Sequence, residues 1–252
     1  MAGYGFGLEE GAVLSGILTM RPMDSDEPMV DLGNATLLVT NISTKTTERL
    51  SRRKGTKGLP LDSATSIDTV GGKLTIDTLN RTTYALATMG ADSDFIQAAG
   101  TDQQVALKLY ERGYMDLGKY KVSNVRVTGG VEGTDFEVLP DSGQIKLVPG
   151  GALTDGQEYQ VTFNCAYIDG YQIDAGTVAV AYVQLRLDGV NEFGNKPFVL
   201  DIPKATLSPD GDLNWISDEV VEAGFNIKTL LKQGEAGMYR MRTFPRATQT
   251  PA

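Results

Sequence analysis

The sequence predicts a mainly β protein: an antiparallel β-sandwich or barrel with one or two short helices, a long loop and a small inserted β module. Two observations support this prediction. Apolar and polar residues alternate with a period of two along most of the chain, as they do in strands that are buried on one face. The 29 glycines interrupt these segments at expected turns such as Gly71-Gly72 and Gly129-Gly130, a pattern typical of antiparallel sandwiches and barrels.

The clearest alternation identifies the strands. Residues 73–79, 159–166 and 183–188 each place every second, apolar residue on one face. The strand at 183–188 continues through a Gly/Asn turn into a returning strand that ends near Lys204. Residues 225–231 again place Phe, Ile, Thr and Leu on a common face. These segments are expected to be half-buried strands.

Helix signals are few. Residues 79–89 form a helix-like segment that is closed by Gly90. A second candidate at 93–99 has Ser93 as its cap, and a third at 218–223 is weaker. Capping residues and terminal glycines are the signals on which these helix predictions depend.

Residues 118–176 are predicted to form a self-contained module inserted into the main fold. Gly133–Val138, a turn at 140–143 and a strand over Gln144–Val148 indicate successive hairpins of a small sandwich. The remaining residues, 1–117 and 177–252, are then expected to form the main β-sandwich.

Residues 43–69 stand apart, because they show no periodicity and few apolar residues. We expect a long loop here, of a length that is uncommon unless the loop is functional or disordered. Six cations and one anion give residues 45–57 a charge of +5, so the rest of this −9 chain carries −14. The segment is a solvated flexible loop, a nucleic-acid patch, or an arm that docks on an acidic neighbour, most simply another copy of the chain. The candidate docking residues are Arg49, Arg52, Arg53, Lys54 and Lys57.

Composition excludes several classes of function. A net charge of −9 and a pI of about 4.6 argue against a protein that grips nucleic acid, since phosphate binding needs clustered Lys and Arg. The absence of histidine excludes Ser-His-Asp and Cys-His catalysis and His-ligated metals. No apolar run approaches the roughly 18 residues of a membrane span, and the N-terminus has no secretory signal pattern. Cys165, the single cysteine, is expected to be buried, which fits synthesis in a reducing cytoplasm.

No segment carries a convincing site for chemistry. Residues 209–214 resemble the start of a calcium loop, but Val221 stands where the bidentate Glu is required, so a polar turn is preferred. The acidic residues at 24–27 and 92–94 are interpreted as partners of free backbone N–H groups. Trp215 and the tyrosines could form a sugar platform, although packing is their ordinary role. We therefore predict no metal, no cofactor and no catalytic residue.

The segments 73–90 and 183–207, taken together, resemble the major tail tube proteins of long-tailed bacteriophages. The resemblance is best over 71–90 and 183–232, fair over 118–165, and in 43–69 concerns length rather than residues. It implies a non-enzymatic subunit that forms homo-hexameric rings, stacked into a hollow virion tail tube for DNA ejection. It also implies synthesis in the host cytoplasm and, as partners, the tail terminator, distal tail or baseplate and tape-measure proteins.

The same resemblance implies roles for individual residues. The basic loop and an N-terminal arm with Tyr4 and Phe6 would reach the adjacent ring, and the helix at 79–89 would pack between subunits. The apolar side of that helix would consist of Leu79, Leu86 and Met89. Asp77 and Gln184 are candidates for the lumen. We expect the lumen to be acidic, so that DNA passes through it without specific binding. No membrane is expected as a partner.

Three alternatives remain open at this point. The chain could be another virion part, such as the tube of a contractile tail or a capsid decoration protein. It could be a carbohydrate-binding or adhesin-like β-sandwich. A carboxylate enzyme is the third alternative, although no pair of acids can be assigned to a cleft from the sequence.

Overall fold

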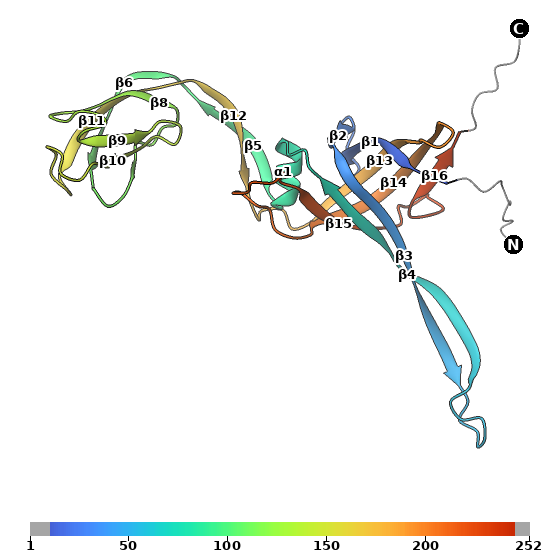
Figure 1. Ribbon diagram of the computed structural model, residues 1–252. Helices are drawn as coiled ribbons and strands as arrows, with labels where there is room; N and C mark the ends of the chain where they lie inside the picture. The colour runs from blue at the N-terminus through green and yellow to red at the C-terminus, as the bar shows by residue number, and fades with distance from the viewer. Residues whose placement is uncertain (1–10, 245–252) are drawn as a thin grey trace, which may run out of the picture. The chain divides into compact units, whose positions relative to one another are not determined.

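The computed structural model describes residues 11–244, which form two compact units. Unit 1 contains the described residues up to Asp92 and from Ile173 onward, and unit 2 is Ser93–Gln172. The protein is mainly β and its sheets are antiparallel, as the alternation predicted (Figure 1). None of the helices in the described residues is long and apolar enough to cross a membrane.

Unit 1 is built on one eight-stranded sheet with the strand order β2-β1-β13-β14-β15-β4-β3, while β16 pairs with β14. Every pairing in it is antiparallel. Its strands are β1 (Leu14–Pro22), β2 (Val30–Asp31), β3 (Ala35–Leu50), β4 (Pro60–Ile76), β13 (Ala181–Asn191), β14 (Lys196–Pro209), β15 (Ala223–Thr229) and β16 (Arg240–Thr243).

The apolar face of this sheet forms the core of unit 1. Leu18, Leu185 and Phe225 come from different strands and are each 1% exposed. The sheet curls, because Leu18 of β1 and Leu38 of β3 line a common cleft although these strands lie near opposite ends of the strand order. In the described residues, β3 has an unpaired outer edge, and β2 covers β1 only at Thr19 and Met20.

One helix is present in the described residues, α1 (Arg81–Ala87), at the place expected for the 79–89 segment. Asn80 caps it: the Asn80 side chain accepts a bond from the Thr83 N–H at 3.0 Å, and the Thr83 hydroxyl accepts one from the Asn80 N–H at 2.7 Å. This reciprocal capping box satisfies two backbone donors that a short helix leaves free.

The other two helix predictions were wrong. Residues 93–99 lie largely in β5 (Ala91–Gln97), which pairs with β12 (Ile168–Asp174), and 218–222 have no helix before β15 begins. The buried Gln97 donates to the carbonyl oxygens of Tyr120 and Ala166 at 2.8 and 3.0 Å. Because such partners are distant in sequence, a short window with a cap-like serine does not distinguish helix from strand.

Unit 2 has its own core between two three-stranded sheets. The first sheet consists of β6 (Gly100–Lys108), β11 (Glu158–Cys165) and β8 (Val122–Val127), and the second of β7 (Met115–Asp116), β10 (Gln144–Leu147) and β9 (Phe136–Leu139). Cys165 is buried, as expected. The unit starts before the predicted residue 118, because β6 pairs along β11.

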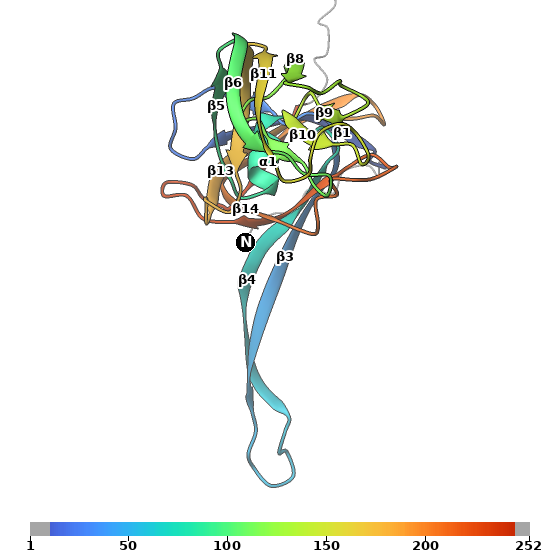
Figure 2. The same cartoon turned by 90° about the vertical axis from the view of Figure 1, so that its left-hand side faces the viewer.

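Residues 43–69 are not a long loop, contrary to the sequence prediction. They form the outer part of a long hairpin of β3 and β4, with a connecting loop of only residues 51–59 (Figure 2). Nearly every side chain between 43 and 69 is exposed on both faces of the ribbon. A ribbon without a buried face has no apolar alternation, so periodicity could not reveal these strands.

Candidate functional site

The outer hairpin, residues 43–69, is the most distinctive feature of unit 1, and we call it the arm. Over this range β3 and β4 pair with each other and with no other strand of the described part of the chain, whereas further inward β4 also pairs with β15. The arm therefore projects from the sheet as a two-stranded ribbon (Figures 1 and 2). An isolated two-stranded ribbon is marginally stable in water, so a partner surface would stabilise it.

Two glycines at the root of the arm allow close strand packing. Gly71 and Gly72 lie within β4, not in the turn that the sequence predicted. A Cβ on Gly72 would lie 1.8 Å from the carbonyl oxygen of Val39, and one on Gly71 would lie 2.6 Å from that of Ile227. Only glycine fits where neighbouring backbones approach this closely.

Short polar cross-strand contacts hold the arm. The hydroxyls of Ser43 and Thr69 lie 2.6 Å apart, those of Thr46 and Thr65 lie 3.0 Å apart, and Arg49 Nε donates to Asp62 at 2.8 Å. The Arg49–Asp62 pair is about two-thirds exposed on both sides, so solvent screens it and it adds little stability.

The tip of the arm, residues 51–59, is an ordered loop built around Ser51. The Ser51 N–H donates to the carbonyl of Leu59 at 2.8 Å, and the Ser51 carbonyl accepts from Gly58 at 2.9 Å. Gly58 and Gly55 both have positive φ, which glycine adopts without strain. Ser51 is buried, whereas the predicted docking residues Arg52, Arg53, Lys54 and Lys57 are all exposed. The tip therefore presents four cations together, with Arg49 at the end of β3.

The other predicted site residues have varied positions. Tyr4 and Phe6 lie outside the described residues. Leu79 and Leu86 pack against the core of their own unit, and Leu86 and Met89 line a hollow of about 480 Å³ beside α1. These contacts occur within one chain.

The two lumen candidates are not brought together. Asp77 follows β4 and accepts a bond from the Asn34 side chain at 2.7 Å. Gln184 lies on β13 and accepts one from Arg21 Nε at 3.0 Å. The strands β14 and β15 separate β13 from β4 in the sheet.

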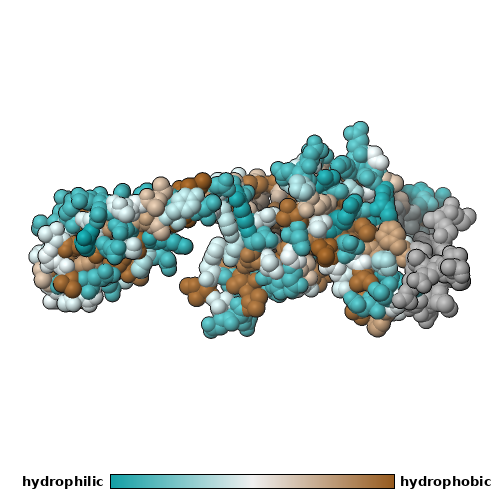
Figure 3. All heavy atoms as spheres, turned by 90° about the horizontal axis from the view of Figure 1, so that it is seen from above, coloured by the Kyte–Doolittle hydropathy of each residue, from teal (hydrophilic) through white to brown (hydrophobic). Residues whose placement is uncertain are grey.

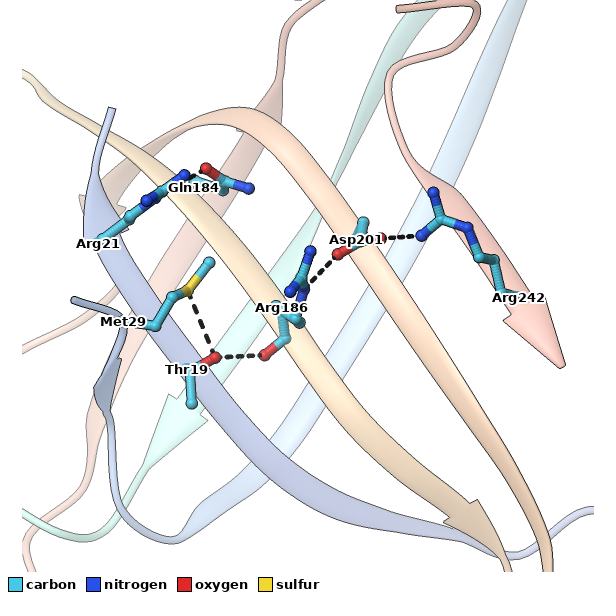
Figure 4. A network of polar contacts seen from close by, with 7 residues as sticks. All are labelled: Thr19, Arg21, Met29, Gln184, Arg186, Asp201 and Arg242. Carbon is cyan, nitrogen blue, oxygen red and sulfur yellow. Dashed lines mark hydrogen bonds and ion pairs between the residues drawn. The ribbon is translucent and has the colours of Figure 1, made fainter. Parts of the chain in front are cut away.

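Gln184 belongs to the outer face of the sheet, the face opposite the core. Figure 4 shows the main ionic contact of this face, in which Arg186 and Arg242 both donate to Asp201. Arg186 Nε donates to Asp201 at 2.6 Å, and the carboxylate is buried while both arginines are about half exposed. Burial would raise the pKa of Asp201, but the hydrogen bonds and positive charges of Arg186 and Arg242 together outweigh it, so this pKa lies below its ordinary value.

Cations outnumber anions on this outer face. Its strands carry cations at Arg21, Lys73, Arg186, Lys228, Arg240 and Arg242, and anions at Asp31, Asp188 and Asp201. The charge of a lumen depends on which face lines it, so the acidic lumen expected from the sequence stays a prediction.

The loop between β14 and β15, residues 210–222, exposes apolar side chains, of which the sequence analysis considered only Trp215, as part of a sugar platform. Trp215 is stacked on Tyr84 of α1, with ring centroids 5.9 Å apart and an interplanar angle of 8°. Trp215 is nevertheless 73% exposed, and Ile216 and Val220 are also exposed. On the face drawn in Figure 3, apolar residues (brown) reach the surface among polar ones (teal). The sequence signal for a surface is apolar residues between acids without a period, whereas the sequence analysis predicted a polar turn over 209–214 and a weak helix over 218–223.

This loop holds no set of metal ligands. Within residues 11–244, no three His, Cys, Asp or Glu side chains are arranged to bind a metal ion. Asp210 is paired with Lys73 Nζ at 2.6 Å, and this contact lowers the pKa of Asp210.

Comparison with known proteins places these features in a family context. Residues 12–238 match the family model described as "Protein of unknown function UCP028589". No curated protein matches the chain.

Proposed function

The chain belongs to this family of unknown function, because the match spans residues 12–238 of its 252 residues, and we propose that the protein is a structural subunit that polymerises into stacked rings. In this proposal the rings form the hollow tail tube of a bacteriophage virion, the conduit for DNA ejection. The tail terminator, distal tail or baseplate and tape-measure proteins are its proposed partners.

The observation that carries the proposal is the arm. It is a long ribbon that pairs with no other strand among residues 11–244 and ends in a cationic, hydrogen-bonded tip. Large apolar side chains are exposed near the tip, among them Leu50, Leu59 and Leu61. Exposed apolar residues gathered on a projecting element mark an interaction site rather than a solvated surface.

The unpaired sheet edges support a ring. In the described residues, the outer edge of β3 has no partner strand, and the edge of β1 that faces away from β13 is paired only at Thr19 and Met20. Exposed edges are templates for pairing with another chain, and a head-to-tail contact that closes by rotation yields a finite ring. The arm would then remain available for the contact between rings.

Negative-stain electron microscopy beside light scattering of the same concentrated sample tests the proposal. The wild-type chain is expected to form hollow tubes with a regular axial repeat. A variant in which an Asn-Gly turn replaces residues 44–68 is expected to fold but to form no long tubes. Among residues 11–244, the replaced residues pair only with one another, so the replacement leaves the core of unit 1 unchanged. An unfolding transition equal to that of the wild type is the control that this variant is folded.

The opposite result would favour another function. A wild-type chain that remains monomeric over the whole concentration range and binds glycans saturably would indicate a carbohydrate-binding or adhesin-like module. Trimers that bind capsids would indicate a decoration protein.

A further inference from the structure

The loop of residues 210–222 and the tip of the arm carry opposite charges. The loop holds five acids and no cation, and therefore carries −5, whereas the tip, residues 51–59, holds four cations and no acid and carries +4. One of the acids, Asp210, is already paired with Lys73. Asp212, Asp218, Glu219 and Glu222 remain on the exposed surface of the loop.

Both segments also expose apolar side chains between their charges. Ile216 is 98% exposed beside Trp215 in the loop, and Leu59 is 57% exposed beside the cations of the tip. Burial of apolar side chains of this size favours association, while charge complementarity steers the two surfaces and selects the register. The two segments are therefore complementary in charge and in hydrophobicity.

The structure also keeps each segment in a defined shape before any contact is made. Ser51 organises the tip by backbone hydrogen bonds, and the stacking of Trp215 on Tyr84 attaches the loop to α1. A preorganised surface loses less conformational entropy on binding.

We propose that the basic tip of the arm in one copy docks on the acidic, apolar β14–β15 loop of a second copy. This inference rests on the proposed function and names the surface that receives the arm. The two segments do not cover each other within one chain, since both are exposed at the same time. The contact is heterologous, so each docked copy still offers a free tip or a free loop, and repetition extends the assembly along one direction.

Charge reversal of each surface tests the pairing. The tip variant combines Arg52→Glu, Arg53→Glu and Lys54→Glu. The loop variant combines Asp218→Lys, Glu219→Lys and Glu222→Lys. The matched control reverses three exposed acids of unit 2 by Glu132→Lys, Asp141→Lys and Glu158→Lys.

Light scattering of the full-length variants measures the concentration at which tubes form. The tip and loop variants, each alone, are expected to need at least about tenfold more protein than the wild type, because like charges then face each other. An equimolar mixture of the two is expected to form tubes again, since each reversed tip meets a reversed loop. The control is expected to behave as the wild type.

Disulfide trapping separates this inference from the proposed function. Lys54→Cys in one preparation and Glu219→Cys in another are mixed under mild oxidation, and the linked peptide is identified by mass spectrometry. A specific cross-link without tubes would support docking but not the tail tube. Tubes that tolerate both charge reversals, or a mixture that does not recover, would overturn the docking contact and leave the tube proposal standing. Absence of both tubes and cross-link would refute both.

Discussion

Replacement of Asp201 by Asn tests how the outer face of the sheet is stabilised. The Asp201 side chain is 9% exposed and accepts bonds from Arg186 and Arg242. Removing one partner of a buried ion pair costs about 3–5 kcal/mol when the remaining charge stays buried. Here the two arginines are 50% and 45% exposed, so water solvates them after the change, and we expect a loss of about 1–2 kcal/mol.

Urea unfolding followed by Trp215 fluorescence measures this loss. Trp215 is the single tryptophan and stacks on Tyr84 in unit 1, so its signal reports the unit that contains Asp201. Asp62→Asn is the control, because the Asp62–Arg49 pair on the arm is exposed on both sides and its loss should change the free energy of unfolding by less than about 0.5 kcal/mol. If Asp201→Asn changed stability no more than this control, the Asp201 cluster would not stabilise the sheet.

The pH dependence of the same difference gives a second check. The folded-state pKa of Asp201 lies below its ordinary value of 3.8. A depressed carboxyl pKa contributes stability that is fully present above the unfolded-state pKa and is lost as the pH falls through the folded-state pKa. The stability difference between wild type and Asp201→Asn should therefore be constant from pH 7 to about 5 and shrink below 3.8. A difference that grew on acidification would contradict the assigned sign.

Three further outcomes are expected. Amide hydrogen exchange in residues 43–69 should be fast in the isolated chain and slow in the tube, since a two-stranded ribbon without a partner opens readily; strong protection in the monomer would argue against docking. Asn80→Ala should cost about 1 kcal/mol through loss of the helix cap, measured by urea unfolding, with Ser63→Ala at an exposed position of the arm as comparison. Phe225→Ala should cost about 3–5 kcal/mol, because the ring is 1% exposed in the core, and a near-neutral result in the same assay would mean that the cavity collapses.

The alternation of the sequence predicted the strands that have one buried face. Val183 and Leu185 face the core while Gln184 faces outward, as the period of two requires. The helix after Asn80 was predicted for a similar reason, because its capping box is local. The helix predicted at 93–99 was wrong because the contacts of Gln97 that decide its conformation involve Tyr120 and Ala166.

The candidate site was predicted in part. The cations of residues 49–57 were identified from their density in the sequence, but their conformation was predicted wrongly as loop. The receiving loop at 210–222 was not identified, because its exposure depends on how β14 and β15 are joined in the sheet and on the stacking of Trp215 against Tyr84.

By itself, the sequence determined the composition and the charge of the protein. It also determined the strands whose side chains alternate between core and water, since this alternation depends on residues one or two positions apart. Only the tertiary structure decided that 43–69 is a paired arm, that Asp201 is buried between two arginines and that Trp215 stacks on Tyr84 of α1 while staying exposed. Each of these features requires partners far away in the chain, and a periodic pattern carries no information about partners at such distances.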